Sequence, residues 1–189
     1  MAKAASNVGP RRQPGTFGAT GLAGVTIGTR PLRGLVQIAG WGDFETRAEP
    51  VLRSVGLKDP GDYRTAQKTG TVTAWRIAPD RLLFEGAEDL SSHHSGKLVV
   101  LDLSHARTVI TLEGDGARDL LSSLIALNTQ TTVFAKGHFL QTVIQGVGVL
   151  VQCTGDTSFE IFVPRTWAGS LWDLVYDTGL SFGVTVQAG

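Results

Sequence analysis

The architecture follows from one segment, VVLDLSHARTVITLEGDGARDLL at residues 99–121. Its first residues belong to an apolar run at 97–103 that predicts a buried strand, and residues 108–112 predict a second strand. A turn follows at 114–116, where Asp115 can cap the next backbone N–H groups. Apolar residues then recur at i, i+3, i+4, i+7 and i+8, the spacing of one helix face: Ala117, Leu120, Leu121, Leu124 and Ile125.

The flanking segments extend this alternation in both directions. Toward the C-terminus we expect strands at 139–145, 149–152, 159–163 and 182–186, a turn at Gly146-Val147-Gly148, and a helix at 166–178. Toward the N-terminus we expect a strand at 35–39, a helix at 44–55 despite Pro50, a loop at 58–70, a hairpin of 71–78 with 81–85, and a short helix at 87–92. The order strand–helix–strand–strand–helix–strand thus occurs twice. It predicts an α+β protein of two tandem ferredoxin-like (βαββαβ) units, roughly residues 34–105 and 106–189.

Residues 1–33 differ in composition from the rest of the chain. All five charges before Asp43 are positive (Lys3, Arg11, Arg12, Arg30 and Arg33), and nine of the 24 glycines precede that residue. Such a segment has little apolar surface to bury, so we expect a flexible Gly/Pro-rich basic N-terminal arm. The arm is either a disordered tail or a segment that orders by lying across a partner, with Phe17, Leu22, Val25 and Ile27 as anchors. A transit peptide is a weaker alternative because no amphipathic period is visible.

Composition excludes several classes of function. Seventeen basic and seventeen acidic residues give no net charge, which argues against a nucleic-acid-binding protein. Apolar runs are far shorter than the roughly 20 residues of a membrane span, so no membrane association is expected. One cysteine, Cys153, excludes an internal disulfide and fits a reducing compartment, so we expect a cytoplasmic protein.

Several residue groups suggest chemistry, and each has a simpler interpretation. Asp102, Ser104 and His105 contain the residue types of a triad, but neighbours at one strand end alternate faces, so a turn bonded to backbone is the better interpretation. The histidines His93, His94 and His138 lack a complete ligand set for a metal site. Cys153 at the end of an apolar strand is expected to be inert, and Gly114-Asp115-Gly116 is not a phosphate loop because no Lys-Ser/Thr follows.

The pattern D-x-S-H … G-x-x-A-x-x-x-L within residues 99–121 resembles the aminomethyltransferase-like superfamily, which includes the glycine-cleavage T protein. Later pieces resemble the gamma subunit of heterotetrameric sarcosine oxidase: Val133-Phe134, Gly137 to Thr142, Gly146 to Val149, Phe162 to Arg165, and Leu171 to Asp173. The resemblance covers residues 70–186 well and the first 70 poorly. It implies that residues 34–189 form a gamma-subunit domain with the fold of the folate-binding domain of aminomethyltransferases.

The resemblance also implies a function for the whole assembly. This chain would be a non-catalytic structural subunit beside a large alpha subunit that carries flavin and NAD, with beta and delta subunits completing the complex. That complex would demethylate sarcosine oxidatively to glycine and pass the one-carbon unit to tetrahydrofolate. FAD, FMN, NAD, tetrahydrofolate and zinc are expected in the complex, and none is expected on this chain.

One departure from the superfamily supports the non-catalytic interpretation. The folate-using transferases carry a carboxylate after the glycine-rich turn of the central hairpin, whereas Gly146 to Cys153 contains no Asp or Glu. Three alternatives remain open. The chain is a gamma-type subunit of a related enzyme such as N-methylglutamate dehydrogenase, a stand-alone folate-binding protein, or a free-standing binding module.

The expected partner interface lies on the helix at 166–178 and on nearby polar residues. Apolar side chains cover most of that helix, so it is either enclosed in its own domain or also packed against another chain, and aromatic residues are typical anchors of interfaces. The predicted interface residues are Trp167, Trp172, Tyr176, Arg165, Gln141 and Thr142.

Overall fold

The computed structural model describes residues 13–19, 24–87 and 89–187. The chain forms two compact units, each built on its own sheet. We call them the five-stranded unit, which contains Leu32–Ala106 with Gly137–Leu140, and the seven-stranded unit, which contains the described residues up to Pro31, Arg107–Lys136 and those from Gln141 onward. The predicted α+β class is confirmed, since both units combine a sheet with few helices.

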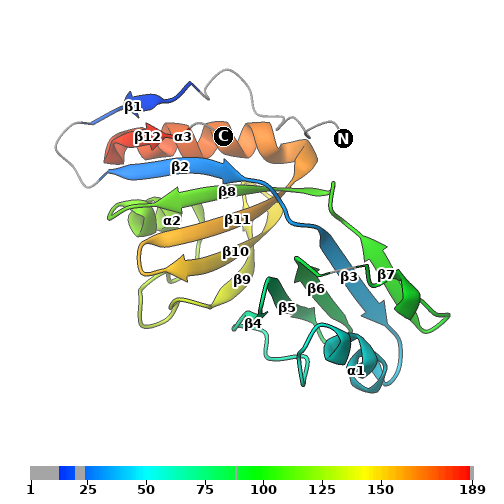
Figure 1. Ribbon diagram of the computed structural model, residues 1–189. Coiled ribbons are helices and arrows are strands. Elements are labelled where there is room, and N and C mark those ends of the chain that lie inside the picture. The colour runs from blue at the N-terminus through cyan, green and yellow to red at the C-terminus, as the bar shows by residue number, and fades with distance from the viewer. Residues whose placement is uncertain (1–12, 20–23, 88, 188–189) are drawn as a thin grey trace. The chain divides into compact units, whose positions relative to one another are not determined.

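The five-stranded unit is an antiparallel sheet with a helix on one face (Figure 1). Its strands, in spatial order, are β4 (Gln67–Thr69), β5 (Val72–Ala78), β6 (Arg81–Glu85), β3 (Leu35–Gly40) and β7 (Leu98–Asp102). Helix α1 (Phe44–Ser54) buries Phe44, Ala48, Val51 and Leu52. These side chains pack on the alternate residues Ile38, Leu82, Phe84 and Leu98 of the sheet, as the period-two pattern of the strands requires.

Two predictions for this unit are wrong in detail. Among the described residues of the helix expected at 87–92, only the 3-10 turn η2 (Ser91–His93) begins, because Asp89 and Ser91 bond to one another and to nearby backbone, which favours turns over helix interiors. The loop expected at 58–70 contains the short strand β4, which pairs with β5. The strands β5, β6, β3 and β7 keep the 2-3-1-4 order of a ferredoxin-like sheet, but the second α-helix of that unit is absent among its described residues.

The seven-stranded unit carries two helices. Its strands, in spatial order, are β1 (Gly15–Phe17), β12 (Val184–Val186), β2 (Val25–Arg30), β8 (Arg107–Glu113), β11 (Ser158–Pro164), β10 (Val147–Gly155) and β9 (Phe139–Ile144). The helices are α2 (Ala117–Leu124) and α3 (Ala168–Gly179), and the 3-10 turns η3 (Arg165–Trp167) and η4 (Leu180–Phe182) flank α3. All pairs are antiparallel except β12 with β2, among those whose register is defined.

Both helices pack against one another and against the sheet. Gly179 shows how close this packing is: a Cβ atom built there would lie 2.6 Å from a methyl group of Val184 and 3.3 Å from Ile27. The core on this side contains Ile27, Ile110, Leu112, Leu120, Leu121, Ile161, Leu171, Trp172 and Val175, each at most 2% exposed.

The predicted flexible arm is wrong for the residues that the structure describes up to Arg30. Strand β2 lies between β12 and β8, with Val25 and Ile27 fully buried, and β1 pairs with β12. The period-two alternation of Val25, Ile27 and Thr29 with Thr26, Gly28 and Arg30 explains this, since it gives the segment one apolar face despite its glycines. Residues 1–12 and 20–23, including Arg11, Arg12 and Leu22, lie outside the described residues.

Smaller boundary errors have local causes. The central hairpin turns at Gln145 and Gly146, both with positive φ, so Val147 and Gly148 already belong to β10. The helix expected at 166–178 begins as the turn η3 and becomes α-helical at Ala168. The last strand starts at Val184 because Gly183, at φ 74°, ends the turn η4 before it.

Candidate interaction surfaces and polar clusters

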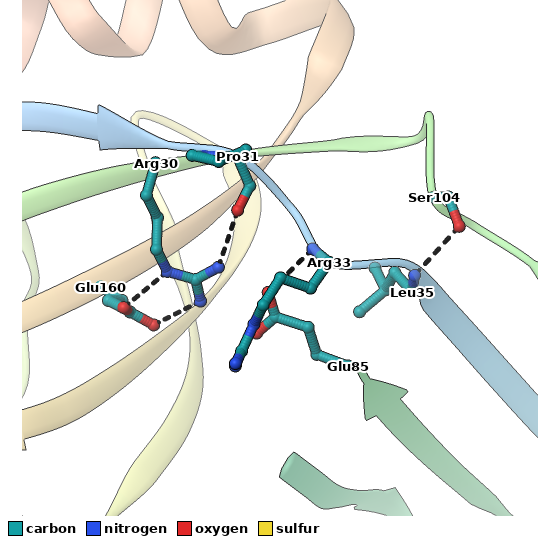
Figure 2. Close-up of polar contacts among 7 residues, drawn as sticks. All are labelled: Arg30, Pro31, Arg33, Leu35, Glu85, Ser104 and Glu160. Carbon is teal, nitrogen blue, oxygen red and sulfur yellow. Dashed lines mark hydrogen bonds and ion pairs between the residues drawn. The ribbon is translucent and has the colours of Figure 1, made fainter. Parts of the chain in front are cut away.

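The Asp102–Ser104 pair forms a turn at the end of β7. Asp102 Oδ1 accepts hydrogen bonds from the Ser104 hydroxyl at 2.5 Å and from the Ser104 N–H at 2.9 Å. The hydroxyl in turn accepts the N–H of Leu35 at 3.0 Å, which joins the start of β3 to this turn (Figure 2). Both bonds from Ser104 hold the pKa of Asp102 below its usual value. The D-x-S-H motif therefore supplies a strand-end turn, as the simpler interpretation predicted, and His105 takes no part in these bonds.

Of the three histidines considered for a metal, His93 and His94 are adjacent at the end of η2, whereas His138 lies elsewhere. His94 Nδ1 accepts the N–H of Val100 at 3.3 Å, beside β7, while residue 138 forms an isolated bridge with Thr65. Within the described ranges, no group of three His, Cys, Asp or Glu side chains lies close enough to hold a metal ion.

Cys153 lies in the core of the seven-stranded unit. Its side chain is fully buried, and its thiol donates to the Gly155 carbonyl at 3.0 Å. Burial raises the pKa of the Cys153 thiol. Arg118 approaches the sulfur at 3.9 Å and also bonds the carbonyls of Thr129, Phe134 and Asp156. Arg118 thus fastens the loop after α2, and Cys153 remains a protonated, enclosed thiol.

Arg30 and Glu160 form a two-bond ion pair in the seven-stranded unit. Arg30 Nε and Nη2 each donate to one carboxylate oxygen at 2.6 Å, the parallel two-bond geometry typical of strong arginine–carboxylate pairs (Figure 2). The guanidinium also lies 5.4 Å from the ring centroid of Phe162 and donates to the Pro31 carbonyl. Both carboxylate oxygens of Glu160 are therefore bonded to Arg30.

In the five-stranded unit, Glu85 anchors the residues that precede β3. Its side chain is 1% exposed, accepts the N–H of Arg33 at 3.3 Å and lies 3.8 Å from the Arg33 guanidinium (Figure 2). A buried carboxylate needs such partners because its desolvation is costly. Arg30 precedes Pro31 and is bonded to Glu160 in the seven-stranded unit. Arg33 follows Pro31 and contacts Glu85 in the five-stranded unit. Each arginine therefore holds the chain to its own unit at one end of the connecting segment.

The predicted aromatic anchors of α3 fall into different environments. Trp167 is 52% exposed, whereas Trp172 is 1% exposed and belongs to the core. Tyr176 is half-buried, and the ring of Phe17 packs on it edge-on with centroids 5.8 Å apart. Trp172 therefore offers no exposed area to a partner, because its side chain is enclosed by its own domain. Of the three, Trp167 is the residue that solvent reaches most.

The polar residues predicted with them are not gathered into one site. Gln141 and Thr142 lie on β9, an edge strand of the sheet, whereas Arg165 begins the turn η3 that follows β11. Exposed apolar residues outside the prediction include Trp41 at 63% and Leu101 at 42%. The sequence offers one signal for an exposed Trp41, because this residue comes just after the strand expected at 35–39 and directly before Gly42.

Comparison with known families identifies the family to which this fold belongs. A family model described as the GCVT N-terminal domain matches residues 72–188, more than half of the chain. The chain belongs to the GCVT N-terminal domain family. The match begins at Val72, the first residue of β5, so β2 lies outside the matched region although it completes the seven-stranded sheet.

Two solved structures share the fold. A chain of the heterotetrameric sarcosine oxidase from Corynebacterium sp. U-96, solved with pyrrole 2-carboxylate, superposes with a TM-score of 0.74 at 19% identity, over 92% of this chain and 90% of that one. The glycine cleavage system aminomethyltransferase T from Bartonella henselae superposes with a TM-score of 0.57 at 16% identity. There the match covers 86% of this chain but 47% of the transferase.

No curated protein sequence matches the chain. Among the described residues, no helix is both long and apolar enough to cross a membrane.

Proposed function

We propose that this chain is a non-catalytic assembly subunit of a heterotetrameric, flavin-dependent sarcosine oxidase, equivalent to its gamma subunit. The observation that carries the proposal is the extent of the structural match. The chain corresponds to almost the whole of a sarcosine oxidase chain but to less than half of the aminomethyltransferase. The likeness in fold to most of that sarcosine oxidase chain supports the proposal.

The polar chemistry of the described residues supports the same proposal. Glu160 is paired with Arg30, Asp102 is bonded to Ser104, and Cys153 is buried and protonated. The central hairpin carries no carboxylate between Gly146 and Cys153. These groups stabilise the fold, which supports the proposal that the substrate chemistry and the cofactors FAD, FMN, NAD, tetrahydrofolate and zinc belong to other subunits of the complex.

Co-purification from the native host tests this proposal. A tagged copy of the chain is expected to bring down a large flavin-containing chain and two further subunits, with sarcosine-dependent reduction of the flavin in the purified complex. Failure to recover any flavoprotein would refute the assembly proposal. Recovery of a complex that oxidises N-methylglutamate but not sarcosine would assign the chain to the related dehydrogenase.

A folate-binding protein is the second candidate, and one observation favours it. Gln152 is 2% exposed, and its side-chain nitrogen has no hydrogen-bond partner among the described residues. It lies opposite Glu160 in the β10–β11 register, so both side chains are on the same face of the sheet. A buried donor of this kind is costly unless it is satisfied by water or a ligand. Calorimetry with tetrahydrofolate and the purified chain tests this candidate, and absence of heat at high micromolar folate would exclude it.

A further inference from the structure

Strand β12 would be an edge of the seven-stranded sheet if β1 did not cover it (Figure 1). On its other side, the N–H of Gln187 donates to the Ile27 carbonyl of β2 at 3.0 Å. Backbone groups of successive residues point to opposite sides of a strand, so those of Val184 and Val186 point toward β1, which pairs with them. We call this row of outward-pointing backbone groups the β12 edge.

Residues 15–19, which we call the strap, close the β12 edge. Within β1, Thr16 lies opposite Thr185, and their hydroxyl oxygens are 3.3 Å apart. The ring of Phe17 packs edge-on against Tyr176 of α3. The strap thus covers both the edge and the exposed side of an aromatic residue on the neighbouring helix.

Two glycines let the strap lie close to the turn η4. The N–H of Ala19 donates to the Leu180 carbonyl at 2.9 Å. A Cβ atom built at Gly18 would lie 2.8 Å from the Cα of Leu180 and closer still to its carbonyl oxygen, and one built at Gly183 would lie 2.5 Å from the Ala19 carbonyl oxygen. Gly18 also has φ 83°, which a side chain disfavours. Any side chain at position 18 therefore displaces the strap.

Few contacts hold the strap in place. Strand β1 has three residues, and residues 16–19 are all exposed, Phe17 by 37%. The strap contains no charged residue, so no side-chain ion pair anchors it. Short exposed segments near a terminus open at little cost in free energy, while the core of the domain stays folded. The strap can therefore open without unfolding the sheet beneath it.

The edge that an open strap leaves is suited to pairing with a second copy of itself. The sequence Val184-Thr185-Val186 has neither the charge nor the proline that protects natural strand edges. In an antiparallel pair with a twofold axis at Thr185, that residue lies opposite Thr185 of the second copy, as it lies opposite Thr16 in the closed chain. Val184 then lies opposite Val186 of the second copy, so the same backbone groups are paired.

We propose that the β12 edge is a self-pairing surface and that the strap is its intramolecular inhibitor. Opening of the strap converts the single chain into a twofold dimer whose two sheets join through β12. Because the paired strands are short, the dimer forms at high chain concentration. The inference is independent of the proposed function, since every contact that carries it lies within the seven-stranded unit.

The test compares Gly18→Ala with Gly42→Ala in the full chain. Gly42 has φ 70°, so both substitutions strain the backbone, but a Cβ atom at Gly42 meets nothing within 4 Å. We expect the amides of Val184 and Val186 to exchange hydrogen roughly tenfold faster or more in Gly18→Ala alone. Light scattering at high micromolar concentration should show the Gly18→Ala mass rising toward that of two chains, with wild type and Gly42→Ala unchanged. Faster exchange with an unchanged mass would overturn the proposal.

A further substitution shows whether the dimer uses the β12 edge. Thr185→Lys places an exposed charge in the middle of that edge, as natural edge strands do. The double variant Gly18→Ala, Thr185→Lys should exchange as fast as Gly18→Ala but remain a single chain. A dimer that survives Thr185→Lys would overturn pairing through β12.

A second way of opening the strap covers failure of the first. Phe17→Ser, which removes the contact with Tyr176, replaces Gly18→Ala if that chain fails to fold or exchanges as slowly as wild type. The same faster exchange and the same rise in mass are expected. Wild-type exchange at Val184 and Val186 in Phe17→Ser would show that the strap does not protect the β12 edge, and the proposal would fail.

Discussion

Arg30 and Glu160 are 130 residues apart in the sequence, yet their side chains meet through two hydrogen bonds of 2.6 Å each. Their side chains are 24% and 18% exposed, so solvent screens the pair only in part. The contact ties the end of β2 to β11 across β8.

We predict that Glu160→Gln lowers the free energy of unfolding by about 1–3 kcal/mol, because a partly buried guanidinium loses its charged partner. The double variant Arg30→Met, Glu160→Leu should recover much of this loss, since apolar residues of similar size remove both desolvation costs. Urea unfolding of the single variants Arg30→Met and Glu160→Leu, together with the double variant, gives the coupling energy. Arg53→Met, which breaks the exposed i,i+4 pair with Glu49, is the control and should cost less than about 0.5 kcal/mol. A coupling energy near zero would show that the Arg30–Glu160 pair does not stabilise the folded chain.

A second prediction concerns the pH dependence of the Asp102–Ser104 turn. The hydroxyl and the N–H of Ser104 lower the pKa of Asp102 in the folded chain below its value in the unfolded chain. The resulting stabilisation is therefore present above the unfolded pKa of about 3.9 and is lost as the pH falls through the lower folded pKa. Ser104→Ala should raise the Asp102 pKa toward its ordinary value, measured by NMR titration of the carboxyl carbon.

The same unit offers a matched control for this titration. Asp89 receives equivalent bonds from the N–H and hydroxyl of Ser91, and its pKa is likewise lowered. Ser91→Ala should therefore raise the pKa of Asp89 and leave that of Asp102 unchanged. If Ser104→Ala left the Asp102 titration unaltered, the hydroxyl bond would not be the main cause of the shift.

Local sequence patterns are sufficient to predict those elements whose stabilising contacts lie close together in the sequence. The helix α2 and the hairpin β5–β6 follow from apolar spacing and from turn residues, and both were predicted within one residue of their ends or better. The composition of this segment, with many glycines and no acidic residues, predicts a flexible arm and not strand β2. Only the alternation at Val25 and Ile27 indicates a strand. Its partners β8 and β12 are distant in sequence, so their contribution could not be seen locally.

Candidate sites were harder to predict for the same physical reason. The turn formed by Asp102 and Ser104 is local, and the sequence interpretation of it is confirmed. The Arg30–Glu160 pair depends on the order of strands, and the burial of Trp172 depends on which face of α3 meets the sheet. The spacing of apolar residues predicts helix α3 and shows that most of its surface is apolar. It does not show whether all of that surface packs within this chain or whether part of it packs against a partner.

The position of β2 gives a third prediction. Ile27→Ala should lower the free energy of unfolding by about 2–4 kcal/mol, because a fully buried side chain is truncated in the core. Thr16→Ala on the exposed edge strand β1 is the control and should change it by less than about 0.5 kcal/mol. Urea unfolding followed by circular dichroism measures both. An Ile27→Ala chain as stable as wild type would return this segment to the flexible arm that composition suggests.

The two tryptophans of the α3 region give the last prediction, because one is enclosed and the other exposed. Trp172→Ala removes a fully buried ring from the core and should cost about 3–5 kcal/mol, observed as a large drop in the urea midpoint. Trp167→Ala should leave stability nearly unchanged, since 52% of that side chain already faces solvent. If Trp167 belongs to the partner interface, the stable Trp167→Ala chain should lose flavoprotein in the co-purification. Full capture by that chain would remove the Trp167 side chain from the interface.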